Sequence, residues 1–234
     1  MQKGILFLIP IPLGEDALFS LPDYCIKTIH GLDYFIAERA RTTRRFIKTT
    51  NPPRPISDLI VFELDKREPE KGIDSFLAPA LSGNDIGLMS EAGCPGVADP
   101  GAKVVAQAHK LGIAVKPLVG PSSLLLALMA SGMNGQSFSF VGYLPQKTPD
   151  LVREIKRLES RSKKYKQTQL FIETPYRNNA LLKTLIDTLS ANTTLGIASR
   201  LTLPDELIIS KPVAQWKKMK SPDLHKKPTV FLIL

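Results

Sequence analysis

The first half of the chain alternates short apolar runs with segments of helical periodicity. The runs are bounded by polar or turn-forming residues, which is typical of buried strands. The expected strands cover residues 4–10, 33–38, 59–64, 85–90 and 113–119. The segments between them predict helices, which cover residues 21–32, 40–50, 68–83 and 104–111. Strands that alternate with crossover helices indicate a mainly parallel sheet with helices on both faces.

The second half has a different pattern, which begins where Gly120 and Pro121 end a strand and an apolar helix follows at 123–132. Its expected strands cover residues 137–144, 168–174, 194–203, 206–213 and 228–234. The strand at 206–213 follows its predecessor too closely for a helical crossover, so it must pair antiparallel with a neighbour. The sequence therefore predicts two α/β domains with a cleft between them. The N-terminal domain covers 1–118 with a mainly parallel sheet, and the C-terminal domain covers 119–234 with a mixed sheet.

The composition is that of a soluble globular protein, with 43% hydrophobic and 23% charged residues among 234. The longest apolar stretches are shorter than the roughly 20 residues of a membrane span. Lys3 before the first apolar run imitates a signal peptide, but Pro10 and Pro12 interrupt that run and no small-residue cleavage site follows. Two cysteines and three histidines are scattered, so we expect no metal site, no disulfide and a cytoplasmic location.

The formal net charge is +9, and two basic clusters carry much of it. The first runs from Arg39 to Arg54 without a single acid, and the second runs from Arg153 to Lys166. Such patches fit contact with the phosphate backbone of a nucleic acid. Either cluster alone would fit a solvated helix face equally well. Two of them on one chain favour a polyanionic partner.

The stretch "SEAGCPGVADPG" at 90–101 directly follows an expected strand. Ligands of open α/β sheets bind beyond the carboxyl ends of strands. Gly93 and Gly96 permit backbone angles closed to other residues and let a ligand approach the chain. The stretch contains Glu91 and Asp99 but no basic residue and no phosphate-binding glycine pattern, so it suits a ligand with hydroxyl groups or a positive charge. A nucleoside with an amino-acid tail and a sulfonium group has these properties. The alternative interpretation is that the stretch is a tight turn needed only for packing.

Five motifs occur in the order and spacing of one known family. They are "LFLIPIPLGE", "SEAGCPGVADPG", "VGPSSLLLALMASGM", "FVGYLP" and "FIETPYR", and they span nearly the whole chain. The second is the most specific, since it matches an S-D-A-G-x-P-x-x-x-D-P-G signature. On these motifs the chain resembles the tetrapyrrole methylase-like family of S-adenosylmethionine-dependent methyltransferases. Within that family it most resembles the branch that methylates a ribose 2′ oxygen of a cytidine in small-subunit ribosomal RNA.

This resemblance implies the tetrapyrrole methylase fold, in which two α/β domains hold S-adenosylmethionine in the cleft between them, usually in a homodimer. It also implies which residues contact the cofactor, mostly through the backbone. These residues are Pro12, Ser90, Ala92, Gly93, Cys94, Pro95, Val97, Asp99, Gly120, Ser122, Ser123, Tyr143, Leu144, Ala198 and Pro228.

The chain departs from the branch in three places that we assign to substrate handling. Arg39 stands where the branch has an aspartate, the stretch "FELDKREPE" at 62–70 replaces a histidine-rich one, and Leu201 stands where a glutamate belongs. The cofactor motifs are therefore better preserved than the substrate motifs.

A ribose hydroxyl is a poor nucleophile that benefits from a positioned base. The candidates are Glu38, Glu91, Asp99 and Glu173, and we favour Glu38, with Arg41 one helical turn onward; an acid that only stabilises the start of a helix is the alternative for Glu38. The residues expected to handle the substrate are Arg44, Arg45, Glu173, Arg177 and Arg200. The expected partner is ribosomal RNA or the small ribosomal subunit.

Two other functions stay open at this point. A methylase of this fold could act on another RNA site, a protein or a tetrapyrrole-like small molecule. A non-catalytic relative that binds the cofactor or RNA would show the same three departures.

Overall fold

The structure is a computed structural model that describes residues 2–65, 68 and 70–234. The chain forms two compact units, Met1–Ser122 and Ser123–Leu234, which are described separately below. Within the described ranges, no helix combines the length and the apolar composition needed to cross a membrane.

The first unit is built on a five-stranded sheet with the order β3-β2-β4-β1-β5, in which every pairing is parallel. Its strands are β1 (Ile5–Ile9), β2 (Tyr34–Ala37), β3 (Ile60–Glu63), β4 (Ile86–Met89) and β5 (Ala114–Pro117). The mainly parallel first sheet that the sequence predicts is confirmed.

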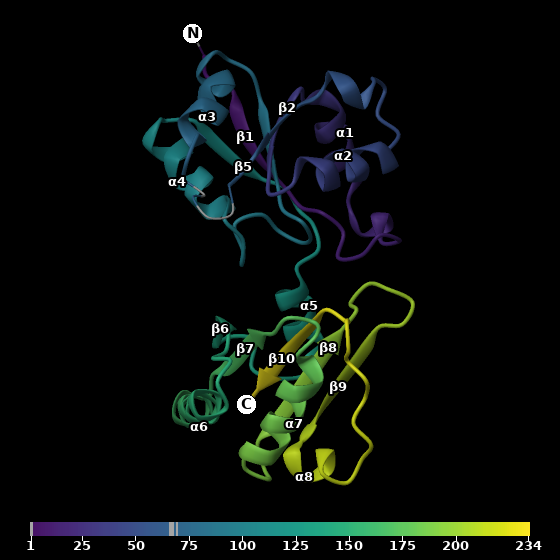
Figure 1. Cartoon of the computed structure of the whole chain (residues 1–234), viewed down its shortest axis with the longest axis vertical. Coiled ribbons are helices and arrows are strands. Elements are labelled where there is room, and N and C mark those ends of the chain that lie inside the picture. Colours follow the sequence, from purple (N-terminus) through teal and green to yellow (C-terminus); the bar gives the residue numbers. More distant parts are fainter. Residues whose placement is uncertain (1, 66–67, 69) are drawn as a thin grey trace. The chain divides into compact units, whose positions relative to one another are not determined.

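Helices cover both faces of this sheet, with α1 and α2 on one face and α3 and α4 on the other (Figure 1). The helical segments are η1 (Leu18–Ser20), α1 (Asp23–Gly31), α2 (Ala40–Thr49), η2 (Ile56–Asp58), α3 (Ile73–Leu81) and α4 (Gly101–Lys110). Side chains alternate across each strand, so Phe7 and Phe35 pack beneath α1 and α2 while Leu6 and Leu88 pack beneath α3 and α4. This double burial is why the strands read as continuous apolar runs.

The second unit is built on a mixed sheet with the order β6-β7-β10-β8-β9. Its strands are β6 (Phe138–Tyr143), β7 (Thr168–Ile172), β8 (Thr194–Ser199), β9 (Leu207–Pro212) and β10 (Thr229–Ile233). Only β6 and β7 pair in parallel; the other three pairings are antiparallel, including that of β9 with β8. The mixed second sheet and the antiparallel pairing of the strand near 206–213 are thus both confirmed.

The helices of the second unit divide between the two faces of its sheet. They are α5 (Ser123–Ser131), α6 (Thr148–Tyr165), α7 (Asn178–Thr188) and α8 (Val213–Trp216). The core beneath α6, α7 and α8 centres on the stacked rings of Phe171 and Phe231, 6.0 Å apart, and on the buried Trp216. The α5 helix packs against β8, β9 and β10, and Gly196 of β8 leaves room for the Met133 side chain just beyond α5.

The strand expected at 194–203 is wrong at its end, because β8 stops at Ser199. Arg200 and Thr202 have positive φ angles of 52° and 69°, which are incompatible with an extended strand. Leu201 is nevertheless buried, which explains why the apolar pattern continued past the turn.

Candidate active site

Three strands of the first sheet end at the same edge. The register pairs Ile9 of β1 with Met89 of β4, and Ala37 of β2 with the same Met89. The residues that follow, Pro10, Glu38 and Ser90, therefore leave the sheet at one level. This carboxyl edge is where open α/β sheets bind ligands.

The loops after β1 and β4 are joined by backbone hydrogen bonds. The Ile11 N–H donates to the Gly93 carbonyl and the Gly93 N–H donates to the Ile11 carbonyl, both at 2.9 Å. Gly93 is buried and has a φ of 73°, so the chain turns there in a conformation that favours glycine. This Ile11–Gly93 bridge holds the loop after β1 (residues 10–14) and the 90–101 loop as one piece, and we call the two the bridged loops.

The acidic and hydroxyl side chains of the 90–101 loop mostly serve the loop itself. The Ser90 hydroxyl donates toward the carbonyls of its own turn, with the Gly93 oxygen 3.2 Å away. Asp99 Oδ1 accepts the N–H groups of Gly96 and Gly101 at 2.7 and 2.8 Å, which closes the loop and fixes the start of α4. Burial raises the pKa of Asp99, against the opposite effect of these two amides. Asp99 thus shapes the backbone of the loop.

The segment that follows β5 lies against the same loops. Cys94 Sγ lies 3.4 Å from the Pro121 carbonyl oxygen. A Cβ on Gly120 would lie 2.2 Å from Pro10 Cγ, so only glycine allows this approach. Burial and the nearby Asp99 charge raise the pKa of Cys94, which keeps its thiol protonated. Of the sequence-predicted cofactor residues, those in the first unit are therefore brought together at one edge.

The helix α2 begins beside this edge and presents three faces. Thr43 and Ile47 are buried in the core. Arg41, Arg44 and Lys48 follow the i, i+3, i+7 spacing of a second face, which we call the basic stripe. Within the part of the chain that the structure describes, no carboxylate pairs with the three cations of this stripe.

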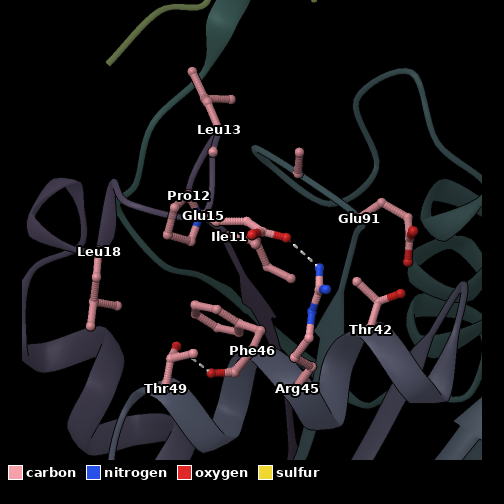
Figure 2. Close-up of a pocket in the computed structure, with 12 residues that line it drawn as sticks. Ile11, Pro12, Leu13, Glu15, Leu18, Thr42, Arg45, Phe46, Thr49 and Glu91 are labelled. Carbon is pink, nitrogen blue, oxygen red and sulfur yellow. Dashed lines mark hydrogen bonds and ion pairs between the residues drawn. The ribbon is translucent and has the colours of Figure 1, made fainter. Parts of the chain in front are cut away.

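The third face of α2 lines a cavity of about 430 Å³ (Figure 2). It is bounded by the loop after β1, by the start of the 90–101 loop and by α2. The lining residues are Ile11, Pro12, Leu13, Gly14, Glu15, Leu18, Thr42, Arg45, Phe46, Thr49, Glu91 and Ala92. Arg45 Nη2 contacts Glu15 Oε1 at 2.6 Å and so connects α2 to the loop after β1. Glu38 and Arg41 are not among the lining residues.

In the second basic cluster, some of the cations are paired with acids of their own helix. On α6, Arg153 pairs with Asp150 at 2.7 Å and Arg157 pairs with Glu154 at 2.6 Å. The hydrogen bond from Arg157 also lowers the pKa of the Glu154 carboxyl. The cluster at 153–166 is therefore partly neutralised, whereas the basic stripe of α2 is not.

The predicted substrate residues of the second unit also have acidic partners there. Arg177 Nη2 lies 2.5 Å from Oε1 of Glu173, whose side chain is only 7% exposed. Arg200 contacts Asp205 and lowers the pKa of that carboxyl. Both arginines thus contribute to the structure of their own loops.

Most of the predicted cofactor residues of the second unit lie at or near strand ends. Tyr143 ends β6 with 60% of its surface exposed, and Leu144 beside it is buried in the core. Ala198 is a buried residue of β8, and the Pro228 carbonyl accepts the Arg200 N–H at 2.9 Å. Ser123 begins α5.

The three departures have different structural settings. Arg39 is exposed in extended backbone just before α2, and Leu201 is buried, where the charge of a glutamate would be costly without a partner. Of the stretch 62–70, positions 66, 67 and 69 lie outside the described residues. Glu63 in that stretch accepts the Ala40 N–H at 2.7 Å, so its carboxylate stabilises the start of α2.

Thr42, Phe46 and Thr49 are cavity residues that reasoning from the sequence missed. A signal existed, because together with Arg45 they follow the i, i+3, i+4, i+7 spacing of one helix face. These apolar and hydroxyl residues were missed because they lie within the basic cluster at 39–54, which was interpreted only by its charge. Among the described side chains, no group of three or more histidines, cysteines, aspartates or glutamates is placed to hold a metal ion.

The family model for tetrapyrrole (corrin/porphyrin) methylases matches residues 11–216. The chain belongs to the tetrapyrrole methylase family. It is accordingly a methyltransferase, and the resemblance drawn from its five motifs is confirmed. The matched range contains both the bridged loops of the first unit and most of the second unit.

Individual relatives agree with this family. The chain is 31% identical over 230 residues to a protein of Vibrio cholerae named ribosomal RNA small subunit methyltransferase I, an alignment that covers 98% of this chain and 76% of the relative. It is 33% identical over 190 residues to the Bacillus subtilis protein of the same name, covering 80% and 61%. The Escherichia coli O157:H7 protein of that name is 26% identical over 236 residues, covering 100% and 78%.

Proposed function

We propose that this protein transfers a methyl group from S-adenosylmethionine to a ribose 2′ oxygen of small-subunit ribosomal RNA. The observation that carries the proposal is the similarity over almost the whole chain to relatives named for methylation of that RNA. The basic stripe of α2 supports it, since its three cations, with which no described carboxylate pairs, suit the phosphates of a nucleic acid.

The residues at the carboxyl edge fit a cationic methyl donor. When bound, S-adenosylmethionine would supply the methyl group on a positively charged sulfur. Gly93 would contact it through its backbone, and Gly120, which packs closely against Pro10, would hold the neighbouring segment in place. The carboxylate of Glu91 is exposed at the same edge, and no basic side chain of the 90–101 loop would oppose a positive charge.

Among the four candidate carboxylates, the position of Glu38 at the carboxyl edge of the first sheet supports a role as base. Glu38 is half-buried and leaves the sheet at the level of Ser90, beside the cofactor loop. We therefore keep Glu38 as the proposed base for the ribose hydroxyl, with Arg41 holding the adjacent phosphate.

The assembly and location follow from the resemblance. We propose that the protein acts on the small ribosomal subunit in the cytoplasm and that it works as a homodimer. Sedimentation velocity of the purified protein tests the dimer directly, because a single species with the mass of one chain would contradict it.

The function is tested by transfer of labelled methyl groups to small ribosomal subunits from a strain that lacks this gene. Nuclease digestion of the product should place the label on a ribose 2′ oxygen. Absence of label on RNA, together with label on a protein or on a tetrapyrrole, would overturn the proposed acceptor.

A matched pair of variants tests the base in the same assay. Glu38→Gln should lower the turnover number by about 100-fold or more while S-adenosylmethionine affinity stays near that of the wild type. Asp187→Asn removes an exposed carboxylate of α7 that pairs only with Lys183 among the described residues, and it should leave turnover at saturating RNA within a few fold of the wild type. A large loss of cofactor affinity in Glu38→Gln would contradict the assignment.

A further inference from the structure

The cavity beside α2 has no role in the function as proposed so far. We propose that it binds one unpaired nucleobase of a single-stranded RNA segment whose phosphates lie on the basic stripe. This inference rests on the proposed RNA substrate and adds a base-binding subsite to it.

The cavity lies on the α2 side of the bridged loops. Of the sequence-predicted cofactor residues, only Pro12 and Ala92 line it. Gly93, Cys94 and Gly120, which turn toward Pro121 and Pro10, do not. The cavity is therefore a neighbour of the region assigned to the cofactor, and a ligand within it would lie beside that region.

The lining of the cavity suits a flat aromatic ring with amino groups. Phe46 supplies an aromatic face, and Ile11 and Leu18 add apolar surface (Figure 2). Nucleobases stack on such aromatic side chains irrespective of sequence. Its volume of about 430 Å³ lies within the range of about 300 to 1,000 Å³ that is usual for small-ligand sites.

The polar groups of the cavity disfavour a phosphate and favour a base edge. Glu91 brings an exposed carboxylate to its rim, and Thr42 and Thr49 bring hydroxyl groups. Carboxylates accept hydrogen bonds from amino groups of bases, whereas they repel phosphates. The guanidinium of Arg45 is already paired with Glu15 at the exposed rim of the cavity. A phosphate would therefore bind more favourably on the basic stripe than in the cavity.

The helix α2 sets both parts of this surface at fixed spacing. The cations of the basic stripe and the cavity residues occupy adjacent faces of the same three-turn helix, and Arg41 and Arg45, four residues apart, lie on either side of their boundary. A strand of RNA that follows the stripe would have its bases free to turn toward the cavity. Single-stranded RNA is recognised in this way, with unpaired bases stacked on aromatic side chains.

The experiment compares two polyanions of matched charge, a short oligocytidylate and an inorganic polyphosphate of the same length. Affinities are measured by competition in low salt for the wild type and for Phe46→Leu, which keeps an apolar side chain but removes the aromatic face. Phe46→Leu should bind oligocytidylate about 5- to 100-fold more weakly and polyphosphate equally well. Phe46→Trp should restore oligocytidylate binding.

Two control variants separate base binding from charge. Arg41→Gln combined with Lys48→Gln should weaken both polyanions together. Phe19→Leu removes an aromatic ring that is 78% exposed and does not line the cavity, and it should change neither affinity. Thermal melts of each variant verify that it is folded.

Each remaining outcome is decisive. Unchanged oligocytidylate affinity in folded Phe46→Leu, or equal loss of both polyanions, would overturn the base subsite. A matching loss of S-adenosylmethionine affinity in Phe46→Leu would overturn it too, because the cavity would then belong to the cofactor. Base-dependent binding without methyl transfer to ribosomal RNA would leave the subsite standing and defeat the proposed function. Methyl transfer to RNA together with binding that does not depend on the base would support the proposed function and overturn the base subsite.

Discussion

Substitution of Gly93 tests whether the bridged loops form the cofactor site. The φ angle of Gly93 is 73°, and an added Cβ would lie 3.4 Å from Leu13 Cδ2 and 3.7 Å from the Pro121 carbonyl oxygen. These separations are ordinary contacts, so Gly93→Ala meets no steric clash. Its cost comes from the left-handed backbone alone, about 1 to 2 kcal/mol. Urea unfolding should show that loss of unfolding free energy.

Gly132→Ala is the matched control for this change. Gly132 has a φ of 69°, and no atom lies within 4 Å of its added Cβ. It belongs to the second unit and is not a residue of the bridged loops. It should lose the same about 1 to 2 kcal/mol of unfolding free energy as Gly93→Ala while S-adenosylmethionine affinity stays unchanged.

Gly93→Val distinguishes a loss of cofactor binding from a loss of folding. A β-branched side chain in this conformation is a backbone outlier, and its methyl groups extend beyond Cβ toward Leu13 and Pro121. Relief of the crowding costs about 1 to 3 kcal/mol more and must move the loop that Ile11 holds. The protein should stay folded, since the core of the first unit is untouched.

Calorimetry with S-adenosylmethionine measures the consequence for binding. We expect affinity in Gly93→Val to fall by at least about 100-fold, equivalent to about 2.7 kcal/mol. Wild-type affinity in folded Gly93→Val would remove the loop from the cofactor site. A stable Gly93→Ala beside a destabilised Gly132→Ala would refute the argument from backbone conformation.

Two further predictions concern Asp99 and Arg177. Burial raises the pKa of Asp99 in the folded protein, so the wild type loses unfolding free energy as pH rises through that raised pKa. Asp99→Asn keeps an oxygen for the two loop amides and removes this pH dependence. The unfolding free energy of Asp99→Asn relative to that of the wild type, measured in urea, should therefore increase from about pH 4 to about pH 7. A decrease over this pH range would contradict the raised pKa. Arg177→Met leaves the buried Glu173 carboxylate without its ion pair and should cost about 1 to 3 kcal/mol in urea unfolding. Unchanged stability with weaker RNA binding would show instead that Arg177 contacts RNA.

The fold was predictable because the hydrophobic patterns of buried strands and of helices both occur in the sequence. Continuous apolar runs with helical segments between them define the parallel sheet, and the short spacing before 206–213 defines the antiparallel pairing. The end of β8 was not predictable in this way. Leu201 continues the apolar pattern, but the positive φ angles of Arg200 and Thr202 turn the chain, and hydrophobicity carries no information on the sign of φ.

The candidate site was predictable only where the backbone itself demands particular residues. Gly93 and Gly96 marked the 90–101 loop because their positive φ angles favour glycine. The cavity needed a tertiary fact, that the face of α2 with Phe46 turns toward the loop after β1. The support that Glu63 gives to the start of α2 likewise depends on β3 lying beside β2. Neighbours in a sheet that are distant in sequence leave no local signal.

The strand order also decides when each unit can assemble during synthesis. In the first sheet β1 lies between β4 and β5, so its pairing is complete once Ala114–Pro117 has left the ribosome. In the second sheet β10 lies between β7 and β8, so that sheet stays split until Thr229–Ile233 emerges. Domains made first generally fold first on the nascent chain. The bridged loops and the basic stripe of α2 therefore take their final arrangement while the second unit is still an incomplete polypeptide.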